Sequence, residues 1–230
     1  VYKRQLDAFG GPDREHENFS SIQKAISYSM TSVFTTGGIR GGKVRVGGSF
    51  HPRSFNMGIS REVLNRTDGF SRMRFGEDID FSIRIIEAGF NVGLIADAWV
   101  YHKRRSNFNK FFKQVYNSGA ARIDLSLRHP GTLKITHFFP AAFLSYLVAA
   151  LLYTSFVYLG EVSLLPLVLY LAVLAVDAGR RFRSVPLIVL AVAASVIQLV
   201  GYGLGFTIGI ARRVVLGRPE AHAFEQTYYS

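Results

Sequence analysis

The pattern of apolar and polar positions divides the chain into a mixed first part and a hydrophobic second part. Apolar residues at spacings of three and four predict amphipathic helices over 19–34, 78–88 and 108–123. The last of these, rich in Phe, Lys and Tyr, suits a membrane surface. Short apolar runs between polar turns predict strands over 54–59, 91–95 and 98–102. Ser60 is placed to cap a further helix.

The second part predicts membrane-spanning helices over about 138–159, 162–177 and 185–210. A helix rises about 1.5 Å per residue, so the first and third segments can cross about 30 Å of hydrocarbon. The second segment is short for a full crossing. We expect domain boundaries at 6–125 for a soluble α/β part, 126–137 for a juxtamembrane linker, 138–211 for the membrane helices and 212–230 for a polar tail.

The composition narrows the choice of partners. The chain carries 27 Lys+Arg against 16 Asp+Glu and a formal net charge of +11, mostly in the first part. This charge suits phosphate-bearing ligands or an anionic membrane surface. We expect no nucleic-acid partner, because the cations are dispersed and no nucleic-acid motif occurs. The absence of cysteine excludes disulfides and thiolate metal sites.

The start of the chain is unusual. Residues 1–5 resemble a translated sequencing adapter, and we expect further protein upstream of Leu6. Residues 36–48 are rich in glycine and in cations, which predicts a loop. Their spacing matches neither of the two common phosphate-binding loop motifs.

Two clusters of polar residues are candidates for chemistry. Glu77, Asp78 and Asp80 begin a predicted helix, where acids either complement the helix dipole or supply a general base. His102 ends a predicted strand and precedes three cations. It can be a metal ligand, a phosphate donor or an ordinary surface histidine, and the cations can bind a diphosphate or lie near anionic lipid.

The order of the motifs resembles that of a known family. The motifs are Gly10-Gly11-Pro12, 23–28, Thr36-Gly37-Gly38, 56–61, Asp68-Gly69-Phe70, 76–80, Arg84 and 100–105. Over about residues 6–125 this order is similar to the second half of a family 2 glycosyltransferase domain. The hydrophobic helices that follow resemble those of bacterial enzymes that build surface polysaccharides.

The resemblance implies an α/β fold of the GT-A type, a mainly parallel sheet flanked by helices. The chain would hold a partial GT-A domain that lacks its N-terminal half, followed by an α-helical transmembrane region. The family's metal-binding Asp-x-Asp motif would lie upstream. The main ligands of a Mg²⁺ or Mn²⁺ cofactor, and part of the nucleotide site, would therefore precede Leu6.

The resemblance also assigns roles to residues. Asp78 corresponds to the catalytic base and Glu77 to its supporting acid. The residues implied in substrate binding are Asn56, Asp68, Gly69, Arg104, Arg105 and Gln114. His102 corresponds to a late metal or diphosphate ligand. Gln114 lacks the Arg-Trp continuation found in some processive members.

The expected function is that of an inverting glycosyltransferase of the hexosyltransferase type. It would move a sugar from a nucleotide-diphosphate donor to a lipid-linked or polysaccharide acceptor in cell-surface glycan synthesis, and this chain alone would be inactive. The alternative is a non-catalytic membrane subunit that binds or exports polysaccharide or lipid phosphates. The acids at 77–80 favour the enzyme, because a transporter needs its polar groups inside the spans, and the most polar residue between the ends of these spans is Gln198.

We expect a multi-pass protein of the bacterial cytoplasmic membrane with its catalytic part in the cytoplasm. Three crossings would place Arg180, Arg181 and Arg183 inside, as the positive-inside rule favours. They would also place the C-terminus and its arginines outside, against that rule. We nevertheless expect an external C-terminus, because the alternative, a helix that bends back within lipid, requires protein cover.

Overall fold

The computed structural model describes residues 6–36, 50–158 and 160–220. The supposed adapter residues 1–5, nearly all of the glycine-rich loop and the last ten residues of the polar tail lie outside these ranges.

In the described residues of the first part, the strands form two small sheets. The strands are β1 (Ala8–Gly10), β2 (Asp13–Arg14), β3 (Met57–Ile59), β4 (Val92–Leu94) and β5 (Val100–Tyr101). β1 lies between β3, which is antiparallel to it, and β4, which is parallel, while β2 pairs with β5 in parallel. Two of the three pairings among the described strands are therefore parallel, and β3 is an antiparallel edge strand.

The three predicted strands are present but shorter than expected, and β1 and β2 were not predicted. Residues 10–12 have the composition of a turn, which hid the two strands on either side. In the structure these glycines serve close packing instead. A Cβ on Gly10 would lie 2.7 Å from the carbonyl oxygen of Asn56, so a side chain there would push the strands apart.

The helices of the first part follow the predicted pattern with changed ends. They are α1 (Ser21–Thr31), α2 (Val33–Thr36), the 3-10 turn η3 (Ser54–Asn56), α3 (Arg61–Thr67), α4 (Glu77–Glu87) and α5 (Phe108–Arg128). The predicted helix over 19–34 breaks at Ser32, which has extended backbone. Ser60 caps α3 as expected. α5 continues into the predicted linker, which reduces that linker to a short segment before the 3-10 turn η4 (Ile135–His137).

The second part consists of long apolar helices. They are α6 (Phe139–Phe156), the 3-10 turn η5 (Gly160–Leu164), α7 (Leu165–Phe182), α8 (Val185–Ile210) and the π-helical turn η6 (Ala211–Val215). Among the residues that the structure describes, three helical segments are long and apolar enough to cross a membrane: Ile135–Phe156, Gly160–Phe182 and Val185–Val215. These helices agree with the expected membrane region.

α7 is longer than the short segment that the sequence predicted. It includes Asp177 and Arg181 because the first part of the chain satisfies both of them. The Tyr28 hydroxyl donates to the Asp177 carboxylate at 2.7 Å, and Ser32 donates at 3.1 Å. Arg181 donates to Glu15 at 3.1 Å. The end of α7 is thus fixed against α1.

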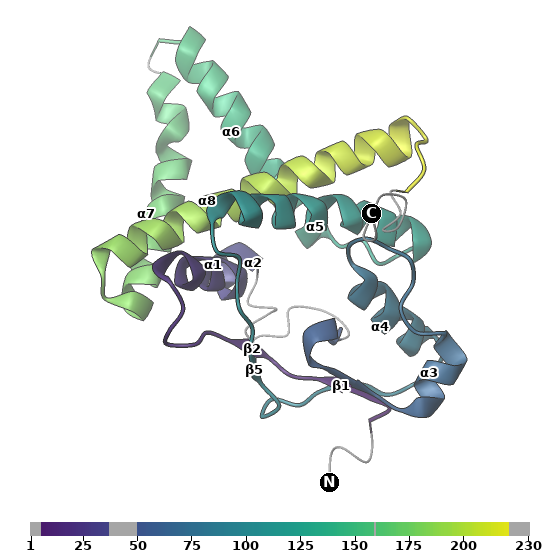
Figure 1. Ribbon diagram of the computed structural model, residues 1–230. Helices are drawn as coiled ribbons and strands as arrows, with labels where there is room; N and C mark the ends of the chain where they lie inside the picture. The colour runs from purple at the N-terminus through teal and green to yellow at the C-terminus, as the bar shows by residue number, and fades with distance from the viewer. Residues whose placement is uncertain (1–5, 37–49, 159, 221–230) are drawn as a thin grey trace, which may run out of the picture.

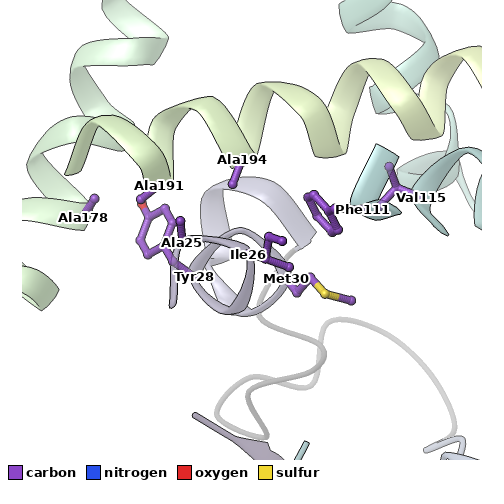
Figure 2. Close-up of a cluster of buried hydrophobic side chains, with 9 residues drawn as sticks. All are labelled: Ala25, Ile26, Tyr28, Met30, Phe111, Val115, Ala178, Ala191 and Ala194. Carbon is purple, nitrogen blue, oxygen red and sulfur yellow. The ribbon is translucent and has the colours of Figure 1, made fainter. Parts of the chain in front are cut away.

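The largest buried cluster joins the two parts of the chain. It is formed by Ala25, Ile26, Tyr28 and Met30 of α1, Phe111 and Val115 of α5, Ala178 of α7, and Ala191 and Ala194 of α8. Figure 2 shows the α1 side chains lying against α8, with the α5 side chains beside them. Burial of this apolar surface holds the membrane helices to the α/β part.

α8 packs along α5, and small residues permit the contact. Gly201, Gly205 and Gly209 recur every four residues on α8 and face α5. A Cβ on Gly205 would collide with the backbone of Tyr116, and one on Gly209 would lie 3.2 Å from the Cα of Ala120. Such spacing of small residues allows helix backbones to approach closely. The apolar face of α5 that the sequence assigned to the membrane surface is therefore covered by α8.

Residues that flank both ends of α8 contact the α/β part of the chain. Near its start, Arg181 contacts Glu15 and donates to Thr31 at 3.0 Å. Beyond its end, the Arg213 guanidinium pairs with Asp124 of α5 at 2.5 Å. Figure 1 shows α6 and α7 projecting away as a hairpin while α8 lies along α5. These contacts favour a C-terminus on the side of the α/β part over the external C-terminus expected from the sequence, and such a placement would satisfy the positive-inside rule.

We therefore expect a C-terminus on the same side of the membrane as α5. The chain has no cysteine, so single cysteines can be introduced at Pro219 and, as a control, at Tyr158. Tyr158 lies between α6 and α7 and is 91% exposed. In intact cells an impermeant thiol reagent should label Tyr158→Cys, and it should label Pro219→Cys only after the membrane is opened. Equal labelling of both in intact cells would restore the external C-terminus.

Candidate active site

The N-terminus of α4 presents three acidic side chains. Gly76 caps the helix with a φ of 82°, and a Cβ there would lie 3.0 Å from Leu125 of α5. The sharp entry into α4 therefore favours glycine. Glu77, Asp78 and Asp80 occupy the first turn, where negative charge complements the helix dipole. Each carboxylate has a different environment, so the three differ in accessibility and in the roles they can take.

Asp78 is held by a cation that the sequence did not single out. Nη1 of Arg53 lies 3.4 Å from each carboxylate oxygen, and the Asp78 side chain is 14% exposed. The ion pair orients the carboxylate while leaving part of it accessible. Arg53 directly precedes η3, and its distance from Asp78 in the sequence gave no signal of this contact.

Glu77 and His51 are the titratable neighbours of this pair. Burial raises the pKa of Glu77, and the charge of Asp78 adds to that effect. Burial, together with the charges of Arg53 and Arg122, lowers the pKa of His51 to about 4. His51 is therefore neutral near pH 7, and within the described residues its buried Nδ1 has no hydrogen-bond partner. Sequence reasoning missed this histidine.

Asp80 is a buried structural acid rather than an accessible one. Its side chain is 2% exposed and accepts hydrogen bonds from Nε2 of His129 at 2.9 Å and from Nε of Arg84 at 3.0 Å. Burial alone would raise the pKa of Asp80. Hydrogen bonds from His129 and Ser71 and the charge of Arg84 outweigh burial and hold it below its usual range.

The same arginine fixes the predicted acceptor-side turn. Arg84 donates to the carbonyl oxygens of Thr67 and Gly69, at 2.5 and 2.6 Å. Asp68 and Gly69 have φ angles of 54° and 70°, so the turn is left-handed at both positions. A cavity of about 520 Å³ opens between this turn, Asp80 and His129. Asp80 and Arg84 thus connect the turn to the helix that carries Asp78.

A second group of polar residues surrounds β5. Nη1 of Arg104 lies 2.7 Å from Asp13 and 3.2 Å from Nδ1 of His102. The His102 ring stacks on Phe55, with centroids 3.9 Å apart. Arg104 is 5% exposed, and its Nε and Nη2 donors have no partner among the described residues. Two buried cationic donors are therefore available to an anion.

The other predicted substrate-binding residues lie in two separate places. Nε of Arg105 donates to the side-chain oxygen of Gln114 at 3.1 Å, so these two residues meet on the surface. The Asn56 amide donates to the carbonyl oxygen of Ala98 at 2.7 Å, which ties η3 to the segment before β5. η3 and the residue before it contact both groups, through Arg53 to Asp78 and through Phe55 to His102.

The residues around His102 do not by themselves fit a metal ion. Its nearest carboxylate, Asp13, is 3.8 Å away and is already paired with Arg104. Across 6–36, 50–158 and 160–220, no group of three His, Cys, Asp or Glu residues is placed to hold a metal. The positive charge in this part of the site comes from Arg104.

Comparison with known proteins gives one family. The family model described as glycosyl transferase family group 2 matches residues 43–177. The match includes both members of the Glu77–Asp78 pair, the turn at 68–70 and the residues around His102. No curated protein matches the chain.

Proposed function

The chain belongs to glycosyl transferase family group 2, and we propose that it is an inverting glycosyltransferase of the hexosyltransferase type. It transfers a sugar from a nucleotide-diphosphate donor to a lipid-linked or polysaccharide acceptor in cell-surface glycan synthesis. The reaction takes place at the cytoplasmic face of a bacterial inner membrane. The apolar helices that pack against the α/β part support a membrane location.

The observation that supports this function best is the accessibility and orientation of the Asp78 carboxylate. A partly accessible carboxylate stands in the first turn of α4, oriented by Arg53, within the matched segment. It needs only to accept a proton from an acceptor hydroxyl to act as a general base. A membrane export subunit has no use for this arrangement, so family membership and Asp78 together favour the enzyme.

The proposed reaction is a single displacement. The Asp78 carboxylate takes the proton of the acceptor hydroxyl, whose oxygen attacks the anomeric carbon from the face opposite the diphosphate. The new carbon–oxygen bond forms as the bond to the diphosphate breaks, which inverts the anomeric centre. The free N–H groups of Arg104 donate hydrogen bonds to the departing diphosphate and stabilise its negative charge, since charge-assisted hydrogen bonds are the strong ones.

The remaining residues position the substrates. The turn at Asp68 and Gly69 borders the acceptor, while Glu77 supports Asp78. Arg105 and Gln114 form the outer edge of the diphosphate site. We retain Mg²⁺ or Mn²⁺ as the expected cofactor, with His102 at most one ligand and the others supplied from outside the described residues. No step of the proposed reaction depends on this metal ion.

The role of Arg104 can be tested through donor binding. In the native enzyme, Arg104→Lys keeps the charge beside Asp13 but removes the guanidinium donors. Hydrogen bonds to charged groups contribute about 1.5–3 kcal/mol, so the affinity for UDP or GDP should fall about 10- to 100-fold. Isothermal titration with both nucleotides measures the change.

The neighbouring Lys103→Ala provides the control, because Lys103 is exposed and directly adjacent. Its affinity for the same nucleotide should stay within a few-fold of the unmodified enzyme. Thermal unfolding of both variants separates a binding loss from a folding loss. A folded Arg104→Lys protein with unchanged affinity for the nucleotide would assign Arg104 to structure alone.

A further inference from the structure

A second cavity lies beside the start of α4, next to the end of α8. It has a volume of about 260 Å³ and is bounded by the segment before α4, the middle of α5 and the end of α8. Its wall includes Phe75, which is separated from Glu77 only by Gly76. The volume is slightly below the range of about 300–1,000 Å³ typical of small-molecule pockets. That size suits a small polar headgroup whose remainder lies outside.

The charges around this cavity are not balanced. Three arginines and two acids line it: Arg74, Arg212, Arg213, Asp124 and Glu220. Asp124 is paired with Arg213, and Glu220 is paired with Arg128 at 2.7 Å. In the part of the chain that the structure describes, neither Arg74 nor Arg212 takes part in an ion pair. Two guanidinium groups therefore remain to bind an anion.

Exposed apolar residues continue from the same rim. Val214, Val215 and Leu216 follow the lining arginines and are 60%, 74% and 60% exposed. Ile208 and Gly209, at the end of a helix apolar enough to enter a membrane, form part of the wall. Arginines that end an apolar helix lie at the level of the lipid headgroups. A ligand here thus meets cations in the cavity and apolar side chains beside it.

We propose that this cavity binds the phosphate headgroup of an anionic membrane lipid, with Arg74 and Arg212 contacting the phosphate. The acyl chains lie along Val214, Val215 and Leu216, and the headgroup rests against Phe75, next to the catalytic turn. Free phosphate shares the headgroup chemistry but lacks the apolar contact. The proposal concerns binding and does not depend on the transfer reaction.

The test uses the detergent-solubilised protein and native mass spectrometry. The probes are dioleoyl phosphatidic acid, dioleoyl phosphatidylcholine and inorganic phosphate. The double variant Arg74→Gln/Arg212→Gln should bind phosphatidic acid at least about tenfold more weakly, because it removes charge-assisted hydrogen bonds to the phosphate. Arg72→Gln/Arg218→Gln removes two neighbouring exposed charges that do not line the cavity and should leave binding nearly unchanged.

Each other outcome rejects a defined part of the proposal. Equal losses in the two double variants would indicate general attraction of anionic lipid to a basic surface. Equal binding of phosphatidylcholine and phosphatidic acid would show that the anionic headgroup is not recognised. Displacement of the lipid by equimolar inorganic phosphate would make the cavity a site for the free ion. Thermal unfolding of both variants verifies that they fold.

Discussion

Replacement of Asp78 by Asn should lower turnover of the native enzyme by about 10²–10⁴-fold, the usual contribution of a general base. The substitution keeps the size of the side chain, and its amide oxygen can still accept a hydrogen bond from Arg53. Folding and nucleotide affinity should therefore stay close to those of the unmodified enzyme. The measurement is the initial rate of sugar transfer at saturating donor, together with UDP or GDP titration.

Two controls make this result specific. Asp97→Asn removes the charge of an exposed acid in a turn and should not change the rate. Glu77→Gln should lower turnover less than Asp78→Asn if Glu77 only supports the base. A larger loss for Glu77→Gln would transfer the role to Glu77, whose raised pKa also suits proton transfer. If turnover of Asp78→Asn stayed within a few-fold of normal, Asp78 would not be the general base and the proposed mechanism would be wrong.

Replacement of Asp80 by Ala should have the largest effect on stability. The carboxylate is buried and joins His129, Arg84 and the turn at Gly69. Removing one partner of a buried ion pair typically costs about 3–5 kcal/mol, because the other charges stay behind without compensation. Denaturant titration in detergent micelles measures the loss. The exposed Glu17→Ala serves as the control and should change the free energy of unfolding little.

The loss at Asp80 should also depend on pH in a defined direction. The folded protein holds the pKa of Asp80 below its usual value of about 3.9. The charged carboxylate therefore stabilises the fold fully above about pH 4, and this contribution disappears as the pH falls through the lowered folded pKa. The difference between the unmodified protein and Asp80→Ala should narrow in acid. A difference that is constant from pH 7 to 3 would indicate packing rather than charge.

The amino-acid sequence by itself determined the local elements and the order of the motifs. Periodicity placed α4 and α5 to within a few residues at their starts, and the Ser60 cap predicted the beginning of α3. Long apolar runs predicted three helices fit for a membrane. These features depend on neighbours in the chain, so local spacing is sufficient to find them. The ordered motifs also led to the family whose model matches residues 43–177.

Only the tertiary structure decided which distant residues meet and on which side helices end. The contacts Arg53–Asp78, Arg104–Asp13 and His129–Asp80 join residues far apart in the chain, and no spacing rule relates such positions. By length and hydropathy alone, α8 is indistinguishable from a helix that crosses the membrane completely. Packing of its glycine face on α5, together with the ion pair of Arg213 with Asp124, fixes its end against the α/β part. Hydropathy measures how apolar a helix is, whereas the surface that covers it is set by shape and charge in three dimensions.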